Sequence, residues 1–265
     1  MKPTLILCEL ASTDIAGLES YSPFCLKVHR ALKAASLPYT SIHGTRPDEF
    51  KKLNPAGQVP VLLVDGEPIF DSSRILQKID ELAPGTIAPA DPALRSEAYL
   101  WEELADTSLN GFLVAARWAD DRNWTKTKEA YFPDMPAIVR ALVVPKIRSR
   151  VLRSLETRDV TRHGLEETWR RFEELLDLFD ARAPESMFWV GRSLSFADFA
   201  IFAQLGGMRT PLTLWQSAKL AERTKLAAYL DRVDAATRED SAFELSSIPL
   251  ACSPAKMTSP AAAAI

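Results

Sequence analysis

The feature that most limits how this sequence can fold is a proline-rich stretch at residues 84–92. Pro84, Pro89 and Pro92 lie within it, and prolines at this density interrupt helices and stiffen a connection. Strand and helix patterns alternate before this stretch, whereas apolar residues after it recur at helical spacing. A chain of 265 residues is also long for a single core. We therefore predict two domains, residues 1–83 and 93–245, joined by a linker at 84–92.

The segment of residues 1–83 predicts a small α/β domain. Residues 4–8 read as a buried strand, a helix begins at Pro23, and the stretch YTSI supplies a second strand. In VPVLLVDGEPIF, Asp65-Gly66 separates two apolar runs, which is the strongest short-range signal for an antiparallel hairpin. A helix after Asp71 completes the order strand, helix, strand, short helix, strand, strand, helix. This order is that of a thioredoxin-like domain.

The segment of residues 93–245 predicts an all-helical domain, because its apolar residues recur at helical spacing. Pro145 is expected to kink or divide one helix, since proline lacks the backbone donor that a helix needs. Ser195 and Asp198 have the spacing of a capping box that begins an apolar helix. The last stretch, residues 246–265, has little to bury and is expected to be disordered.

The charge balance and the N-terminus argue against several classes of function. The net charge is −3, so the chain has no excess of basic residues with which to hold nucleic acid. The apolar run TLILCEL near the N-terminus is too short for a signal peptide or a membrane span. We therefore expect a cytoplasmic protein that binds neither nucleic acid nor membranes.

Cysteine and histidine are sparse in this sequence and scattered along it. The cysteines are odd in number and far apart, which favours reduced thiols over a disulfide framework. The histidines share no metal-ligand spacing, and no paired-cysteine motif, nucleophile elbow or phosphate loop is present. We therefore expect no metal cofactor. The residues are Cys8, Cys25, Cys252, His29, His43 and His163.

The pair Ser22-Pro23 marks the start of the first helix and has two interpretations. As a helix cap, the serine oxygen accepts from an amide, and proline lacks only an amide that would have no partner. As a site, the same end offers amides, a positive dipole and a hydroxyl to a sulfur anion. Lowering a thiol pKa by ~2 units requires roughly 2.7 kcal/mol, which a dipole (~0.3–1 kcal/mol) and a charged hydrogen bond (~1.5–3 kcal/mol) supply together. The residues alone leave both interpretations open.

Four stretches, in their order along the chain, resemble the cytosolic glutathione transferase superfamily. They are SPFCLKV at a helix start, NPAGQVPVL, FDSSRIL and LSFADFAIF. The resemblance covers nearly the whole chain except the tail. It implies a thioredoxin-like glutathione-binding domain, a helical substrate and dimerisation domain, and glutathione as co-substrate. Within the superfamily, SPFCLKV and TRHGLEE look most like the metaxin and failed-axon-connections branch, whereas the Val-Pro and Asp-Ser pairs look like the catalytic classes.

The resemblance also implies which residues act. Ser22 occupies the position that activates the glutathione thiol in serine-type classes. Gln58, Val59 and Pro60 are expected to bind glutathione, with Val59 and Pro60 joined by a cis peptide bond. Asp71 and Ser72 are expected to bind its γ-glutamyl end through a carboxylate and a helix N-terminus. The family usually has glutamate or glutamine at position 71, and aspartate is one methylene shorter than glutamate.

Other residues near the same helix start, and two tryptophans, are further candidates. Cys25 is an alternative catalytic residue, because a thiol at a helix N-terminus can have a lowered pKa, although its place beside the apolar stripe favours a packed side chain. Tyr21 offers a second hydroxyl but is more typical of a pocket wall. Trp118 and Trp124 are candidates for an apolar substrate pocket between the domains, although aromatic residues at helical spacing more often belong to a core.

Three functions are compatible with these residues. The first, which we favour, is a glutathione transferase that activates the thiolate for attack on a small apolar electrophile and works as a homodimer. The second is a glutathione-dependent thiol oxidoreductase that uses Cys25. The third is a non-catalytic, metaxin-like binding or assembly protein.

Overall fold

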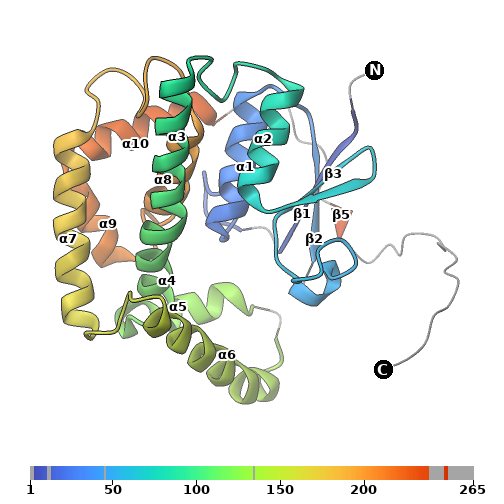
Figure 1. The fold of residues 1–265 in the computed structure, drawn as a ribbon. Coiled ribbons are helices and arrows are strands. Elements are labelled where there is room, and N and C mark those ends of the chain that lie inside the picture. Colours follow the sequence, from blue (N-terminus) through green and yellow to red (C-terminus); the bar gives the residue numbers. More distant parts are fainter. Residues whose placement is uncertain (1–2, 11–12, 45, 134, 239–247, 250–265) are drawn as a thin grey trace, which may run out of the picture.

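The computed structural model describes residues 3–10, 13–44, 46–133, 135–238 and 248–249. It has two parts side by side, a small sheet with two helices and a larger body of helices (Figure 1). The fold is therefore the predicted thioredoxin-like domain followed by an all-helical domain. The domain boundaries given above remain a prediction.

The sheet has the strand order β4-β3-β1-β2-β5. β1 is parallel to β2 and antiparallel to β3, and the very short β5 pairs in parallel with β2. The strands are β1 (Leu5–Leu10), β2 (Thr40–Gly44), β3 (Val61–Val64), β4 (Glu67–Phe70) and β5 (Ile248–Pro249). The tail predicted to be disordered, residues 246–265, lies outside the described residues except for β5.

The hairpin predicted at Asp65-Gly66 is confirmed. Val64 pairs with Glu67 across antiparallel strands, so only two residues make the turn between β3 and β4. Asp65 and Gly66 have φ values of 53° and 92°, which is the backbone of a type I′ turn. β3 begins at Val61 because the preceding proline cannot donate to the ladder.

Helices α1 (Pro23–Ala34) and α2 (Ser72–Leu82) lie between the sheet and the helical domain, and the short helix η1 (Pro47–Phe50) follows β2 (Figure 1). Their apolar faces pack on the sheet in one buried cluster. Phe196 and Phe199 of the helical domain belong to the same cluster. The two domains therefore share part of one core.

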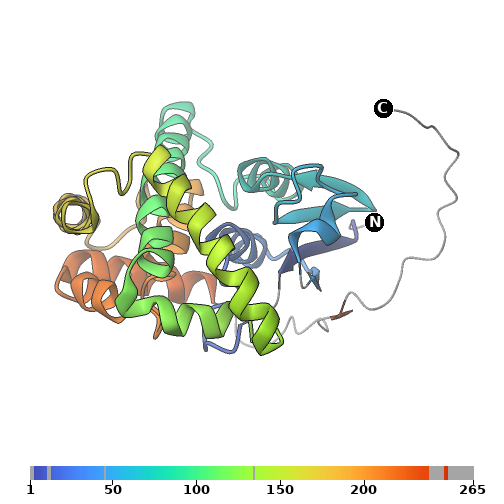
Figure 2. The same ribbon diagram turned by 90° about the horizontal axis from the view of Figure 1, so that it is seen from below.

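The helical domain is built around α8, which is buried nearly all round and packs against α1, α3 and α10. A π-helical turn, η2, joins α3 to α4. Seen from below, α5 and α6 lie across the lower end of the molecule (Figure 2). The helices are α3 (Pro92–Leu104), η2 (Ala105–Leu109), α4 (Asn110–Trp118), α5 (Asp121–Tyr131), α6 (Ala137–Thr157), α7 (Leu165–Arg182), α8 (Phe196–Gly206), α9 (Leu214–Ala221) and α10 (Thr224–Thr237).

One of two predictions about these helices is confirmed, and the other is wrong in part. The capping box is present at the start of α8, where Asp198 accepts hydrogen bonds from the backbone N–H and the hydroxyl of Ser195. Pro145 does not divide its helix, because α6 runs through it without interruption. The carbonyl that loses its donor belongs to Ala141, which is exposed, so water can replace the missing hydrogen bond.

Two buried cations tie α1 to the helical domain. Lys27 pairs with Glu102 at 2.9 Å and with Asp106 of the π-helical turn at 2.5 Å. Arg30 pairs with Asp234 of α10 at 2.8 Å, and both cationic side chains are fully buried. Because a buried charge without its partner is costly, these pairs hold α1 in one position against the helices.

Within the described ranges, no helix is both long and apolar enough to cross a bilayer. Over the same ranges, no group of three or more histidine, cysteine, aspartate or glutamate side chains is arranged to hold a metal ion.

Candidate active site

Ser22 is the N-cap of α1, as predicted. Its φ and ψ are −74° and 119°, and its hydroxyl oxygen accepts from the backbone N–H of Cys25 at 3.4 Å. Pro23 follows at the first helical position, and the serine is only half-buried. A serine hydroxyl that accepts through a lone pair can still donate its own hydrogen. The capping role and the activating role of Ser22 are therefore compatible in this geometry.

The residue before Ser22 is fixed by a buried arginine that the sequence did not reveal. Arg117 of α4 donates to the carbonyl of Tyr21 at 2.5 Å and to the hydroxyl of Tyr131 at 2.9 Å. The second terminal nitrogen of Arg117, Nη2, donates to the carbonyl of Gly207 at 2.8 Å. Arg117 thereby joins the loop that carries Ser22 to three helices of the second domain.

Cys25 lacks the two properties that the thiol oxidoreductase alternative requires. Its side chain is completely buried. Burial raises the pKa of its thiol well above the usual value, and Glu9 raises it further, whereas hydrogen bonds from Ser22 and Ser20 oppose this only in part. A buried thiol with a raised pKa is a poor nucleophile, so the geometry favours the packed cysteine over the catalytic one.

Tyr21, the other alternative catalytic residue, packs against a second tyrosine. Its hydroxyl hydrogen-bonds to Asp14 at 3.2 Å, and its ring lies 5.3 Å from the ring of Tyr131. Burial raises the pKa of its phenol. A phenol with a raised pKa stays protonated at neutral pH, so Tyr21 can act there only as a neutral donor or acceptor.

A buried polar cluster lies close to the start of α1. Glu9 of β1 contacts His29 at 2.8 Å and His43 at 3.2 Å, and His29 also contacts the hydroxyl of Tyr39 at 2.7 Å. Burial alone would raise the pKa of Glu9, but the interactions with His29, His43 and Ser20 outweigh it and lower the pKa to about 2. Glu9 is therefore a buried anion under ordinary conditions.

Replacing Glu9 by glutamine is expected to remove stability that depends on pH. The folded-state pKa of about 2 lies below the ordinary 4.5, so the contribution of Glu9 is fully present above the ordinary value and is lost as the pH falls toward 2. Urea unfolding from about pH 5 to about pH 3 should show the gap in unfolding free energy between the two proteins narrowing by about 2 kcal/mol. A gap that stays constant across this range would contradict the assignment.

Val59 and Pro60 are joined by a cis peptide bond, as the resemblance implies. The bond stands just before β3, with Val59 half-buried, Pro60 buried and Gln58 exposed. The carbonyl of Gln58 accepts from the side chain of Asn54 at 2.9 Å. The side chain of Gln58 is therefore free to reach solvent, while its backbone is held.

Asp71 is the N-cap of α2 and has an unusual backbone. Its φ is 75° with ψ 120°, and a non-glycine residue with positive φ is often found at a functional site. Among the described residues, both capping bonds, from Ser73 at 3.0 Å and Arg74 at 3.3 Å, go to Oδ1, which leaves Oδ2 for a ligand. Ser72 follows at the first helical position and is buried.

The N-termini of α1 and α2 lie at the same end of the thioredoxin-like domain (Figure 1). α4 and α5 of the helical domain are at this end too. The two helix starts capped by Ser22 and Asp71 therefore lie at the same end of this domain, although they are far apart in the sequence. Two helix N-termini at one edge favour an anionic ligand.

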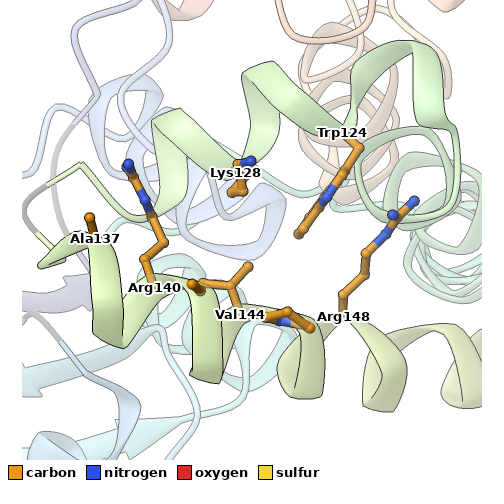
Figure 3. A pocket seen from close by; sticks show the side chains of 8 residues that line it. Trp124, Lys128, Ala137, Arg140, Val144 and Arg148 are labelled. Atoms are coloured by element: carbon orange, nitrogen blue, oxygen red, sulfur yellow. The ribbon is translucent and has the colours of Figure 1, made fainter.

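The two tryptophans predicted to line a pocket are in contact with each other. The ring centroids of Trp118 and Trp124 lie 5.5 Å apart, and Trp118 also contacts Tyr131 at 5.6 Å. Trp124 lines a pocket of about 430 Å³ between α5 and α6 (Figure 3). Trp118 contacts the ring of Trp124 but does not line this pocket.

Two family models match the chain. "Glutathione S-transferase, N-terminal domain" matches residues 21–82, and "Glutathione S-transferase, C-terminal domain" matches residues 162–232. A thioredoxin-like domain with a cis proline before β3, followed by an all-helical domain, defines the glutathione transferase fold. The chain belongs to the cytosolic glutathione transferase superfamily, whose members use glutathione as co-substrate.

Individual relatives agree with this assignment. Protein LigF of Sphingobium sp. strain SYK-6 is 26% identical over 203 residues, covering 75% of this chain and 78% of that protein. Its crystal structure, of a beta-etherase, has a TM-score of 0.63 at 22% identity and covers 88% of this chain and 95% of that one. The probable glutathione S-transferase GSTU6 of Oryza sativa subsp. japonica is 36% identical over 131 residues, covering 46% of this chain and 53% of that protein.

A further solved structure contains the expected co-substrate. It is a glutathione transferase family member from Pseudomonas fluorescens with two glutathione molecules bound. Its TM-score is 0.56 at 15% identity, and the match covers 86% of this chain and 87% of that one. At this identity the likeness shows the shared fold.

Proposed function

We propose that this protein is a glutathione transferase in which Ser22 stabilises the glutathione thiolate. The observation that carries the proposal is the position of Ser22, a half-buried residue whose hydroxyl lies at the N-terminus of α1. The neighbouring thiol of Cys25 is fully buried and is not available for this role. A hydroxyl donor and a helix dipole at one point favour an anion over a neutral thiol.

The remaining glutathione contacts are proposed from the same edge of the sheet. The backbone of Val59, next to the cis bond and outside the ladder of β3, is placed to pair with an extended peptide. Asp71 offers its free carboxylate oxygen to the γ-glutamyl ammonium, and the backbone amides at the start of α2 with the Ser72 hydroxyl offer donors to the γ-glutamyl carboxylate. Gln58 adds a side-chain amide at the rim.

The reaction we propose is a displacement at carbon. A new C–S bond forms as the leaving group departs with the electron pair of its own bond, and the thiol proton is released to solvent. Ser22 donates to the sulfur while it is anionic, and the helical domain supplies the wall that excludes water from the attacked carbon. We also propose that the protein is a homodimer, as the resemblance implies.

A direct test measures glutathione binding and turnover together. Millimolar glutathione should raise the unfolding temperature by mass action, and a chlorodinitrobenzene should be conjugated with release of chloride. Retention on immobilised glutathione without any turnover would favour the non-catalytic alternative. If the protein neither bound glutathione nor turned it over, the proposal would be contradicted.

Replacing Asp71 by asparagine is expected to weaken glutathione binding without weakening the helix cap. Asparagine is as good a cap as aspartate, but it lacks the charge for the ammonium. The KM for glutathione should rise by roughly two- to fivefold, as for loss of an exposed ion pair, with a smaller change in kcat.

A matched control is offered by Asp91, which caps α3. It accepts from two backbone N–H groups through Oδ1, as Asp71 does, and it is exposed. The same replacement at Asp91 should leave the KM for glutathione unchanged. Equal effects at both positions would show that Asp71 acts only through the stability of its helix.

The relationship to LigF favours a second candidate reaction. A beta-etherase that shares 26% identity over 75% of this chain supports ether substrates for the same site. There, the sulfur would attack the carbon that carries an ether oxygen, and the oxygen would leave with the bonding electrons and take up a proton. Turnover of an aryl ether that exceeds that of chlorodinitrobenzene would support this reaction, and no turnover of such ethers would exclude it.

A further inference from the structure

The pocket between α5 and α6 has a chemistry that the proposed function does not explain. Its volume of about 430 Å³ is in the range of small-molecule sites. Apolar side chains of Trp124, Val144 and Pro145 line it together with the cations Lys128, Arg140 and Arg148. None of the side chains that line it is acidic. The pocket therefore combines an apolar wall with one sign of charge.

The cations face the space between the two helices. Arg140 and Arg148 extend from α6 toward α5, and the ring of Trp124 extends from α5 toward α6 (Figure 3). Arg148 is already held by Asp121 at 2.6 Å and lies 4.5 Å from the centre of the Trp124 ring. Lys128 and Arg140, unlike Arg148, form no ion pair with another of the described residues. These two cations are the ones available to a ligand.

One face of α5 runs from this pocket toward the segment that carries Ser22. Trp124, Lys128 and Tyr131 are spaced four and three residues apart, so they share a face. Tyr131 follows Lys128 by one turn, a rise of about 5 Å, and its ring touches that of Tyr21, the residue before Ser22. A ligand that reaches from Lys128 to Tyr131 would therefore extend toward the reacting sulfur.

We propose that this pocket selects aromatic electrophiles that carry a carboxylate. The carboxylate binds between Lys128 and Arg140, and the aromatic ring extends from there along α5 toward Tyr131. The reacting carbon then points to the Tyr21 end, next to Ser22. This inference rests on the proposed function, because it assigns the substrate class of the same site.

Two substrates that differ only in charge test this selection. We would compare 4-chloro-3-nitrobenzoate with the corresponding benzamide, which has the same leaving chloride and an uncharged group in place of the carboxylate. In both, sulfur bonds to the carbon that loses chloride. Arg140→Gln should lower kcat/KM for the benzoate by roughly five- to tenfold, mostly through KM, and change that of the benzamide less than twofold.

Lys146→Gln is the matched control. Lys146 is an exposed cation on the same helix and does not line the pocket, so its replacement removes the same charge from the chain. This replacement should change kcat/KM by less than twofold for either substrate. Equal losses for benzoate and benzamide in Arg140→Gln, or no loss for either, would overturn the charge selection.

A binding measurement separates this inference from the proposed function. The nitrobenzoate should quench the fluorescence of Trp124 without glutathione present, and Trp124→Phe should remove that part of the quenching. If Arg140→Gln weakens this binding while no conjugation occurs, the result supports carboxylate binding in the pocket and contradicts the proposed function. If conjugation occurs with no preference for the charged substrate and no such binding, the proposed function stands and the pocket assignment fails.

Discussion

Replacing Ser22 by alanine is expected to lower kcat/KM for glutathione conjugation by about 10- to 100-fold, with little change in the affinity for glutathione. A hydrogen bond to a charged group contributes ~1.5–3 kcal/mol, and this replacement removes that donor from the sulfur anion. The amides and dipole of α1 remain, so part of the activation survives. Steady-state kinetics with varied glutathione, together with calorimetric binding, measures both quantities.

The same replacement also removes the cap of α1, which costs about 1 kcal/mol of stability. Two controls separate this cost from the loss of activation. Ser22→Thr keeps the hydroxyl and the cap, and it should retain most of the activity. Asp91→Ala removes a helix cap away from the site and should lose stability without losing turnover. If Ser22→Ala turned over glutathione at the normal rate, Ser22 would have no part in the mechanism.

Replacing Asp198 by alanine is expected to cause a large loss of stability. Its buried carboxylate accepts from the backbone N–H of Trp189 and the hydroxyl of Tyr229, each at 2.7 Å. It also accepts from the backbone N–H of Ser195 at 2.8 Å and its hydroxyl at 2.7 Å. Alanine would leave these buried donors without partners, at about 1–3 kcal/mol each. We expect a loss of at least 3 kcal/mol, a large part of the stability of a typical domain.

Ser195→Ala provides the graded comparison. It removes one of the donors to Asp198 and leaves the others in place, so the loss should be about 1 kcal/mol. Urea unfolding followed by tryptophan fluorescence measures both variants, because the buried Trp189 ring lies 5.0 Å from Tyr229. Similar losses in the two variants would mean that Asp198 acts only as a helix cap and not as a link between segments.

Short-range signals in the sequence predicted the parts of the fold that depend on local chemistry. Asp65-Gly66 predicted the hairpin because few residue pairs adopt its backbone. Ser22-Pro23 predicted a helix start because both residues suit the free amides there. Ser195 and Asp198 predicted the start of α8 in the same way. In each case the interaction lies within a few residues of the chain.

Long-range contacts could not be predicted from the same sequence. Arg117 reaches the carbonyl of Tyr21, which is ninety-six residues away in the chain, and no spacing reveals such a pair. Glu9 lies just beyond the strand predicted at residues 4–8, and its contacts with His29 and His43 form only after β1, α1 and β2 pack together. Pro145 was expected to kink or divide one helix, but α6 continues through it, so the local preference of proline did not set the length of this helix.

In the candidate site, too, local features could be predicted from the sequence and long-range contacts could not. Ser22, Asp71 and Val59-Pro60 could be proposed from the sequence because each lies at a helix start or a strand start with a characteristic residue type. The charges of the α5–α6 pocket were missed because Lys128 and Arg140 come from separate helices, and their convergence depends on how those helices pack. Trp124 was identified as a candidate, but its partners in the pocket were not.

The central claim is that the start of α1 holds the sulfur of glutathione as an anion with the help of Ser22. The most direct measurement is the pKa of the bound glutathione thiol, from the ultraviolet absorbance of the thiolate as a function of pH. We expect the bound thiol to titrate ~2 units below a free thiol in the unchanged protein and to recover most of that difference in Ser22→Ala. A bound thiol that titrates like free glutathione, or equally in both proteins, would contradict the claim.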